Sequence, residues 1–340
     1  MIKPATTRLH LNENTAGCSP AVFDTLRALG RGDAGSYPSY DAAREAAAAC
    51  FGVSADHVLL TNGLDEGILA AAAAAFRDRT GAIPETVGVA PAFDMYEVCT
   101  TALGGRMVTV PLDGNYDLDT AALVAAITPA TRIVFLANPH NPSGRPIPLD
   151  ALRDLARRIA PVVLFVDEVY ADFSGESLIQ PGVFTALPNL LVGRTFSKAY
   201  GLAGLRIGAV VGAPRLLEPV RRVVPPYSVN AWAAAALPAA IADRAYRDWY
   251  LGQAAASRDL LEEACRALAL RTWPSAANFV LVHVGERAPA IVAALGARGV
   301  LVRDRSNEAG CEGCIRVTAG IVEDTRRAIA AIEEVLCAVR

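Results

Sequence analysis

Short apolar runs recur along the first two thirds of the chain, and stretches of helical composition separate several of them. The apolar runs are rich in Val, Ile and Leu and occupy residues 87–90, 107–110, 132–137, 162–166, 190–192 and 207–211. The helical stretches contain few helix breakers and occupy residues 41–51, 64–77, 118–127 and 149–159. Continuously apolar strands that alternate with helices indicate an α/β fold with a mostly parallel central sheet and helices on both faces.

The pattern changes near Pro225–Pro226. A long helical region follows at 230–268, and strands are predicted near 278–284 and 314–318. The helices predicted in this part are at 288–298 and 323–338. This second arrangement predicts a smaller C-terminal α/β domain.

Composition narrows the class of protein. The chain has 340 residues, of which 53% are hydrophobic and 20% charged. Its mean hydropathy of +0.30 raises the question of a membrane protein. However, the longest apolar run, residues 68–76, is far shorter than the roughly 20 residues that a spanning helix needs. The N-terminus also lacks the apolar core of a signal peptide. We therefore expect a cytoplasmic protein that does not bind membranes.

Charge and metal-ligand patterns exclude further classes. The net charge is −3, and Lys and Arg are scattered, so we expect no nucleic-acid partner. Seven cysteines in a long chain do not suggest a disulfide framework. Cys311 and Cys314 form one C-x-x-C without a second pair, which we interpret as ordinary thiols in a loop and at a strand start. The four histidines show no ligand spacing, so we expect no metal.

Three polar clusters follow predicted strands, where the ligands of open parallel sheets bind. Asp167 ends the apolar segment VVLFVD, with Tyr170 three residues on. NPHNPSG, residues 138–144, follows another strand and presents two asparagines. TNGLDEG, residues 61–67, places a glycine at a helix start, where backbone N–H groups attract anions. Each cluster alone has a structural alternative: a capping acid, a tight turn, or simple N-capping by Asn62 or Asp65.

A fourth cluster, TFSKAYGLAGLRIG at residues 195–208, indicates a phosphate together with a reactive amine. Thr195 and Ser197 offer hydroxyls, and Arg206 offers a bidentate fork suited to phosphate. Because Arg206 already supplies a cation for the phosphate, Lys198 needs another explanation. A lysine held in a partly desolvated pocket beside other cations has a lowered pKa, so its amine becomes nucleophilic toward aldehydes. A lysine Schiff base, a phosphate and an acid at a pyridinium nitrogen together predict pyridoxal 5'-phosphate.

These motifs resemble, in order and nearly end to end, the fold-type-I pyridoxal-phosphate enzymes of the class I/II aminotransferase family. Within that group the chain is most similar to the histidinol-phosphate aminotransferases. S-K-x₇-R with the N-P-S-G and D-E-V-Y motifs upstream is specific for the superfamily. The further matching segments are LHLNENTAG (9–17), SYP (36–38), PAFDMY (91–96), VLVRDR (300–305) and IRVTAGIVED (315–324).

The resemblance implies a role for each matching residue. Lys198 would form the Schiff base and move the substrate proton, and Asp167 would keep the pyridine nitrogen protonated. Tyr170 and Asn141 would donate to the ring's phenolate oxygen, while Phe93 would stack on the ring. The residues implied around the cofactor phosphate are Gly63, Leu64, Asp65, Thr195, Ser197 and Arg206, with Tyr37 from a partner subunit. The residues implied at the substrate are Asn12, Asn14, Arg303 and Arg316.

The resemblance also implies domain boundaries and partners. We expect an N-terminal arm at 1–30 that packs with the small domain, a large cofactor-binding domain at 31–228, and a small domain at 229–340. Because Tyr37 would serve the neighbouring site, we expect a homodimer. The small-molecule partners would be an amino donor and a 2-oxo acid acceptor.

The leading hypothesis is transfer of an amino group between L-histidinol phosphate and 2-oxoglutarate, which yields imidazole-acetol phosphate and L-glutamate in histidine biosynthesis. Histidinol phosphate has no α-carboxylate, so Arg303 and Arg316 would form one anion site that accepts either phosphate or carboxylate. The chain departs from the family in NENTAG, which lacks a proline after NEN and has no tyrosine to face an imidazole. Two alternatives stay open: an aromatic or other biosynthetic aminotransferase, and a threonine-phosphate-type decarboxylase. A non-catalytic regulator that binds the cofactor is a third hypothesis, but the enzyme-like region leaves no room for a DNA-binding segment.

Overall fold

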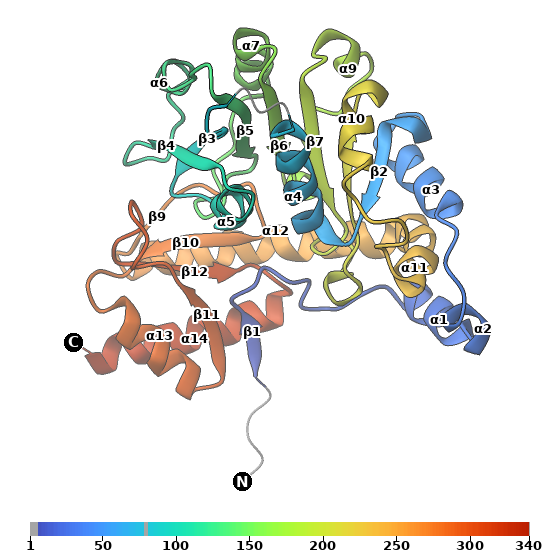
Figure 1. The fold of residues 1–340 in the computed structure, drawn as a ribbon. Helices are drawn as coiled ribbons and strands as arrows, with labels where there is room; N and C mark the ends of the chain where they lie inside the picture. The colour runs from blue at the N-terminus through green and yellow to red at the C-terminus, as the bar shows by residue number, and fades with distance from the viewer. Residues whose placement is uncertain (1–5, 78–80, 340) are drawn as a thin grey trace.

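The computed structural model describes residues 6–77 and 81–339, which form two sheets covered by helices (Figure 1). The large sheet has the strand order β2-β8-β7-β6-β5-β3-β4. All neighbouring pairs are parallel except those made by β8, which is antiparallel to both β2 and β7. The bounds of these strands are β2 (Val58–Thr61), β3 (Glu85–Ala90), β4 (Arg106–Pro111), β5 (Thr131–Ala137), β6 (Val163–Asp167), β7 (Leu190–Thr195) and β8 (Gly208–Gly212).

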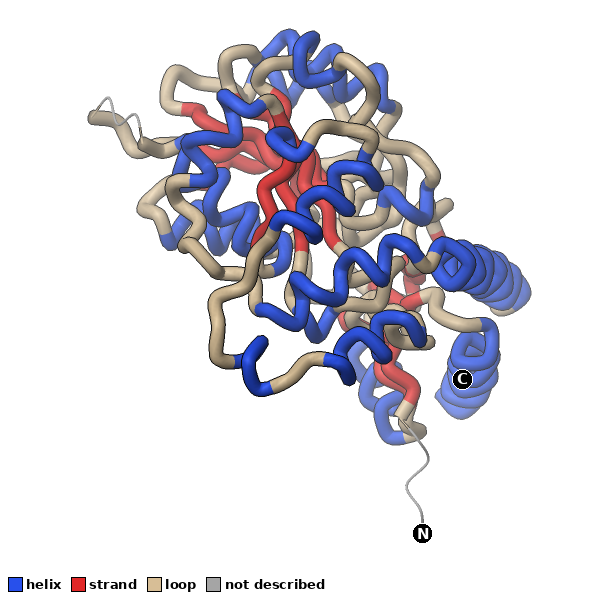
Figure 2. Tube along the Cα trace, turned by 90° about the vertical axis from the view of Figure 1, so that its right-hand side faces the viewer, coloured by secondary structure: helices blue, strands red, loops and turns tan. Residues whose placement is uncertain are grey.

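Helices cover both faces of the large sheet because its central strands are apolar at successive positions (Figure 2). In β5, Ile133 and Phe135 belong to one core, whereas Val134 and Leu136 belong to the other. The first core contains α4 (Gly63–Ala75), α5 (Met95–Ala102) and α10 (Pro214–Arg221). The second contains α1 (Pro20–Ala28), α3 (Asp41–Phe51), α6 (Thr120–Ala125), α7 (Leu149–Ile159), α9 (Val183–Ala186) and α11 (Ala231–Ala242).

The small sheet joins the two ends of the chain, with the strand order β1-β11-β12-β10-β9. Its edge strand β1 pairs in parallel with β11, and Leu9 lies opposite Val302. The strands are β1 (Thr7–Leu9), β9 (Arg271–Thr272), β10 (Phe279–His283), β11 (Val300–Asp304) and β12 (Cys314–Thr318). A separate core packs this sheet against α12 (Arg244–Ala267), α13 (Ala288–Ala297) and α14 (Val322–Val339).

The helix after Pro225–Pro226 differs from the sequence prediction in two ways. The stretch 230–268 is two helices, because the Asp243 carboxylate accepts a hydrogen bond from the Tyr246 amide and caps α12 anew. The buried alanines of α11 also pack in the core of the large sheet. The chain therefore passes from the core of the large sheet to the core of the small sheet after α11, about fifteen residues beyond the boundary expected at 228. The division into an arm, a large domain and a small domain stays a prediction.

Several elements carry too weak a local signal to be predicted. The apolar pattern of the sequence indicated neither β1, β9 and β11 nor α1, α5 and α10. Short helical segments complete the described chain, namely α2 (Arg31–Ala34), α8 (Ala171–Ser174) and two 3₁₀ turns, Ala55–His57 and Ala203–Leu205. Within the described ranges no helix is both long and apolar enough to cross a membrane.

The seven cysteines all lie within the described residues. All seven cysteines are free thiols. Cys311 lies in a loop, Cys314 begins β12, and both are buried. Among the residues described, no group of His, Cys, Asp and Glu side chains is arranged to hold a metal ion.

Candidate active site

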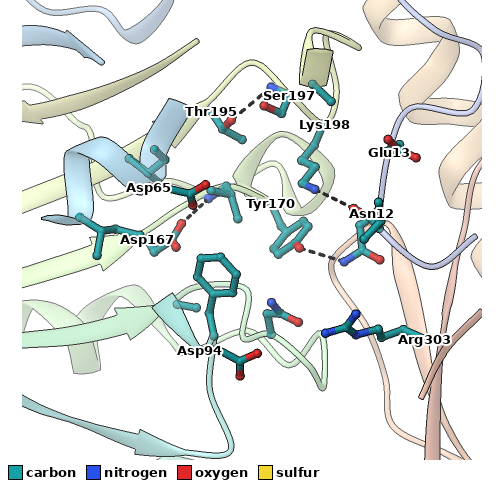
Figure 3. Close-up of a pocket in the computed structure, with 18 of the residues that line it drawn as sticks. Asn12, Glu13, Asp65, Asp94, Asp167, Tyr170, Thr195, Ser197, Lys198 and Arg303 are labelled. Atoms are coloured by element: carbon teal, nitrogen blue, oxygen red, sulfur yellow. Dashed lines mark hydrogen bonds between the residues drawn. The ribbon is translucent and has the colours of Figure 1, made fainter. Parts of the chain in front are cut away.

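A cavity of about 440 Å³ lies at the carboxyl ends of β5, β6 and β7 and faces the small sheet (Figure 3). Ala137, Asp167 and Gly193 are neighbours across these strands, so the segments that follow them begin at one edge. The strand ends thus bring together loops that are far apart in sequence. The predicted site residues that line the cavity are Asn12, Leu64, Asp65, Phe93, Asn141, Asp167, Tyr170, Thr195, Ser197, Lys198, Arg206, Arg303 and Arg316.

Lys198 reaches into this cavity from the loop after β7. Its Nζ donates a hydrogen bond of 2.8 Å to the backbone carbonyl of Leu11 on the N-terminal arm. Burial lowers the pKa of the amine to about 8, and the positive charges of Arg316 and Arg206 act in the same direction. At pH 7 about a tenth of such amines are neutral, compared with well under 1% for an ordinary lysine. The site therefore provides a nucleophilic amine near neutral pH.

Asp167, the last residue of β6, is a buried carboxylate held by neutral donors. Its Oδ2 accepts a hydrogen bond of 2.8 Å from the Tyr96 hydroxyl, and its Oδ1 accepts one of 3.2 Å from the Val169 amide. Burial raises its pKa to about 6, against the lowering effect of these two donors. A buried anion without a cationic partner is costly. A protonated ring nitrogen placed against it would supply the missing positive charge.

Tyr170 and Asn141 each have one hydrogen-bonding group engaged and another free to donate into the cavity. The Tyr170 hydroxyl accepts from Asn12 Nδ2 at 2.9 Å, which leaves its own O–H available. Asn141 Oδ1 accepts from Arg316 Nη1, which leaves its amide N–H groups available. Both side chains can thus donate to one oxygen of a ligand.

The start of α4 and the side chain of Arg206 form an anion cradle. Gly63 opens the helix with φ +73°, and a Cβ added there would collide with the Arg206 guanidinium. Arg206 Nη2 forms an ion pair of 3.0 Å with Asp65 Oδ2. The side chain of Asn62 forms no capping hydrogen bond to α4, so the structural alternative of simple N-capping by this residue is wrong. Ser197 adds a hydroxyl beside this cradle, and its amide donates to Thr195 Oγ1 at 3.2 Å.

Arg303 and Arg316 lie directly opposite each other on β11 and β12, so both side chains leave the same face of the small sheet. Arg316 is buried, and its Nη2 donates to the His10 carbonyl at 3.2 Å. Burial lowers its pKa to about 10. Two guanidiniums on one face of a sheet, beside Lys198, form a site for an anion.

Asn12 lies in the cavity wall as predicted, whereas Asn14 and Tyr37 lie outside it. The Asn12 side chain is already engaged in two hydrogen bonds. Its Nδ2 donates to the Tyr170 hydroxyl, and its Oδ1 accepts a hydrogen bond of 3.1 Å from the Thr318 hydroxyl. Asn14 lies outside the described cavity wall and donates to the Ala199 carbonyl at 3.1 Å, next to Lys198. Tyr37 is 79% exposed and stacks on Tyr227, with 4.4 Å between the ring centroids. Tyr37 therefore takes no part in the cavity of its own chain.

Four lining groups that matter for the chemistry were not predicted from the sequence. Tyr96 belongs to the quoted PAFDMY stretch, but only the fold brings its hydroxyl to Asp167. The Leu11 carbonyl and the Glu13 side chain come from the arm. Arg305 comes two residues after Arg303, and that spacing was a signal that could have identified it, because alternate residues of a strand share a face.

These side chains fit pyridoxal phosphate on four observations of this structure. The desolvated Lys198 amine suits an aldehyde, and the uncompensated Asp167 carboxylate suits a protonated pyridine nitrogen. The Gly63 backbone leaves the space that Arg206 needs beside the start of α4, as a phosphate cradle requires. The Phe93 ring, at the cavity wall, meets Tyr96 edge to face with 5.7 Å between centroids and offers an aromatic surface to a flat ligand.

Comparison with known proteins agrees with this assignment. Residues 6–332 match the family model of aminotransferase class I and II. The chain therefore belongs to the class I and II aminotransferase family, whose cofactor is pyridoxal phosphate. Its similar relatives are histidinol-phosphate aminotransferases. That of Cupriavidus pinatubonensis is 38% identical over 97% of this chain and 88% of its own length. One from Ralstonia nicotianae is 36% identical with the same coverage. The Sinorhizobium meliloti enzyme, solved in complex with pyridoxal-5'-phosphate, superposes with a TM-score of 0.88 at 28% identity, over 99% of this chain and 92% of that one.

Proposed function

We propose that this chain is a histidinol-phosphate aminotransferase, which transfers the amino group of L-histidinol phosphate to 2-oxoglutarate. The products are imidazole-acetol phosphate and L-glutamate. The observation that carries the proposal is the pair Arg303 and Arg316, which project from one face of the small sheet toward the cavity that holds Lys198. The near-full-length similarity to histidinol-phosphate aminotransferases supports it.

Pyridoxal phosphate, when bound, supplies an aldehyde for the lysine amine and a pyridinium ring that withdraws electrons from the substrate Cα. Asp167 would hold a proton at the ring nitrogen, because a cation that lies against it stabilises its buried charge. The Gly63 backbone, Ser197 and Arg206 would hold the cofactor phosphate, and Arg206 would then loosen its ion pair with Asp65. Tyr170 and Asn141 would donate to the ring's phenolate oxygen.

Lys198 moves the proton of the substrate. With cofactor and substrate bound, the Lys198 amine would hold and release the substrate's proton, because burial and the neighbouring arginines lower its pKa to about 8. A base with this pKa accepts a proton from Cα and releases it again near neutral pH. The Leu11 carbonyl, 2.8 Å from Nζ, orients the amine and ties its position to the N-terminal arm.

The two arginines let one pocket accept two substrates. L-Histidinol phosphate carries no α-carboxylate, so its phosphate takes the anion site, whereas glutamate places a carboxylate there. Arg316 is held in place for this role by Asn141 and the His10 carbonyl. A guanidinium that is already fixed loses little conformational freedom when it binds an anion.

The spectrum of the purified holoenzyme tests the substrate assignment. L-Histidinol phosphate should bleach the absorption of the lysine-bound cofactor, and 2-oxoglutarate should restore it. L-Glutamate should bleach it as well. If aromatic amino acids bleach this absorption and L-histidinol phosphate does not, the proposed substrate assignment is wrong. If O-phosphothreonine releases carbon dioxide when no oxo acid is present, the protein is a decarboxylase and not an aminotransferase.

We further propose a homodimer in which Tyr37 completes the phosphate cradle of the partner subunit. Its 79% exposure and its absence from the wall of its own cavity support this role. Subunit mixing tests it. The variants K198A and Y37A should each have little activity, because each lacks one half of every site. Mixed after gentle dissociation, they should recover about a quarter of the wild-type activity, since half of the dimers then contain one intact site. No recovery, or a monomeric holoenzyme in sedimentation, contradicts the proposal.

A further inference from the structure

Arg305 lies on the same face of the small sheet as Arg303 and Arg316. The Arg305 amide donates to the Cys314 carbonyl at 3.1 Å, so pairing with β12 continues past the last residue of β11. Side chains two residues apart on a strand point to the same face. Arg303 in turn is directly opposite Arg316. Three guanidiniums therefore converge on one wall of the cavity, and all three line it.

The Arg305 side chain is buried yet incompletely paired. It is 4% exposed. Its Nη2 forms an ion pair with Glu308. However, neither Nε nor Nη2 has a hydrogen-bond partner of good geometry among the described residues. Each unsatisfied buried donor costs free energy, and Arg305 has two of them, whereas Arg145, Arg194 and Arg316 have one each.

The charges around Arg305 are unbalanced in favour of the cations. Glu308 is half-buried, and burial raises its pKa, while Arg305, Arg303 and Arg316 lower it. One carboxylate thus faces three guanidiniums. The nearby Asp94 carboxylate and the Arg303 guanidinium are both exposed to solvent, which screens their charges, so the buried Arg305 and Arg316 outweigh Glu308. The wall formed by Arg303, Arg305 and Arg316 therefore has the charge of a site for an anion with more than one negative charge.

We propose that Arg305 is a third substrate-binding arginine and that it makes the anion site favour a dianionic phosphate ester over a carboxylate. The proposal rests on the proposed function for the identity of the phosphorylated substrate. A phosphate ester carries close to two negative charges at neutral pH and three acceptor oxygens. A carboxylate offers one charge and two oxygens, which Arg303 and Arg316 already satisfy. Glu308 holds the Arg305 fork in place and gives up part of this contact when phosphate binds.

Inorganic phosphate is the probe of this site, because its use does not depend on the amino donor. In the holoenzyme, inorganic phosphate should inhibit the half-reaction of L-glutamate competitively. The variant R305Q should weaken this inhibition about ten- to hundredfold, as expected for the loss of hydrogen bonds to a charged group. Its apparent affinity for L-glutamate should change less than about threefold. The KM for L-histidinol phosphate should rise in parallel with the inhibition constant of phosphate.

Two further variants separate substrate binding from a structural role. E308Q keeps the shape of the partner but removes its charge, so phosphate should inhibit this variant at least as strongly as the wild type. R305K keeps the charge but loses the fork, and phosphate inhibition should weaken at least about threefold. If R305Q does not fold, R305K and E308Q still decide the question.

The proposal is overturned if R305K responds to phosphate like the wild type. It is also overturned if R305Q and E308Q weaken phosphate binding to the same extent, since the ion pair would then only position the loop. A failure of L-histidinol phosphate to react at all would contradict the proposed function instead. The response of the glutamate half-reaction to phosphate would still report on Arg305.

Discussion

The Tyr96 hydroxyl donates a hydrogen bond of 2.8 Å to Asp167 Oδ2, and the Tyr96 ring stacks on Phe135 with 5.1 Å between centroids. The hydroxyl stabilises the ionised carboxylate, which burial disfavours. Y96F should therefore raise the pKa of Asp167. Because Asp167 is then protonated at higher pH, the acidic limb of the kcat/KM profile should move upward, and activity at pH 6 should fall about three- to tenfold more than at pH 8.

A matched variant distinguishes this effect from a loss of stability. Y40F removes a hydroxyl that donates to the Val229 carbonyl at 2.8 Å, away from the cavity. It should lower the melting temperature without moving the pH profile. Identical profiles for Y96F and the wild type would mean that the hydroxyl does not act on Asp167.

Replacing Asp167 by Asn should separate stability from catalysis. The pKa of Asp167 is raised by burial to about 6, so the ionised form costs free energy in the folded apoprotein at pH above 6. This cost is absent at a pH below the pKa of Asp167 in the unfolded chain, where Asp167 is protonated in both the folded and the unfolded state. D167N should therefore stabilise the apoprotein above pH 6 by up to about 2–3 kcal/mol. Its kcat should nevertheless fall at least about a hundredfold, because the ring nitrogen loses its counter-charge. Denaturant unfolding of the apoprotein at pH 5 and pH 8, together with steady-state kinetics, checks both expectations; a D167N protein less stable at both pH values contradicts the first.

The lowered pKa of Lys198 should be visible when the apoenzyme takes up its cofactor. Only the neutral amine attacks an aldehyde, so the rate of covalent incorporation should rise with pH and level off above a midpoint near 8. Stopped-flow absorbance of apoenzyme mixed with pyridoxal phosphate measures this rate. A rate that still climbs through pH 10 would indicate an ordinary lysine. K198A should show neither incorporation nor turnover.

Gly63→Ala should weaken cofactor binding through a collision with the Arg206 guanidinium. The positive φ of Gly63 adds backbone strain, for which Gly52→Ala is the control. Gly52 has φ +69° at the end of α3, but nothing lies within 4 Å of an added Cβ. Both variants should lose about 1 kcal/mol of stability. Only G63A should raise the dissociation constant of pyridoxal phosphate, by about tenfold or more, in equilibrium titrations of the apoenzyme. Equal affinities in the two variants would show that the cradle tolerates a methyl group.

The parts of the molecule that the sequence predicted share a strong local signal. β5, β6 and β7 each contain an apolar run followed by polar residues at or just after the strand end, and this pattern was enough to predict that Asp167 and Lys198 lie at one sheet edge. β1 has only three residues and pairs with a strand from the opposite end of the chain, so no local pattern predicted it. Tyr96 sits among apolar neighbours in α5, and its hydroxyl meets Asp167 only after the sheet has formed. The roles assigned to individual site residues stay predictions until the variants above are measured.

The position of β1 has a consequence for how the protein is made. Its three residues are translated long before the strand they pair with, β11, which follows all the strands of the large sheet. The large sheet, by contrast, has all its strands by Gly212 and can collapse while the remainder is still being translated. The Leu11 carbonyl that holds Lys198 follows directly after β1. The β1–β11 pairing therefore fixes the Leu11 carbonyl beside Lys198 only after β11 has been translated.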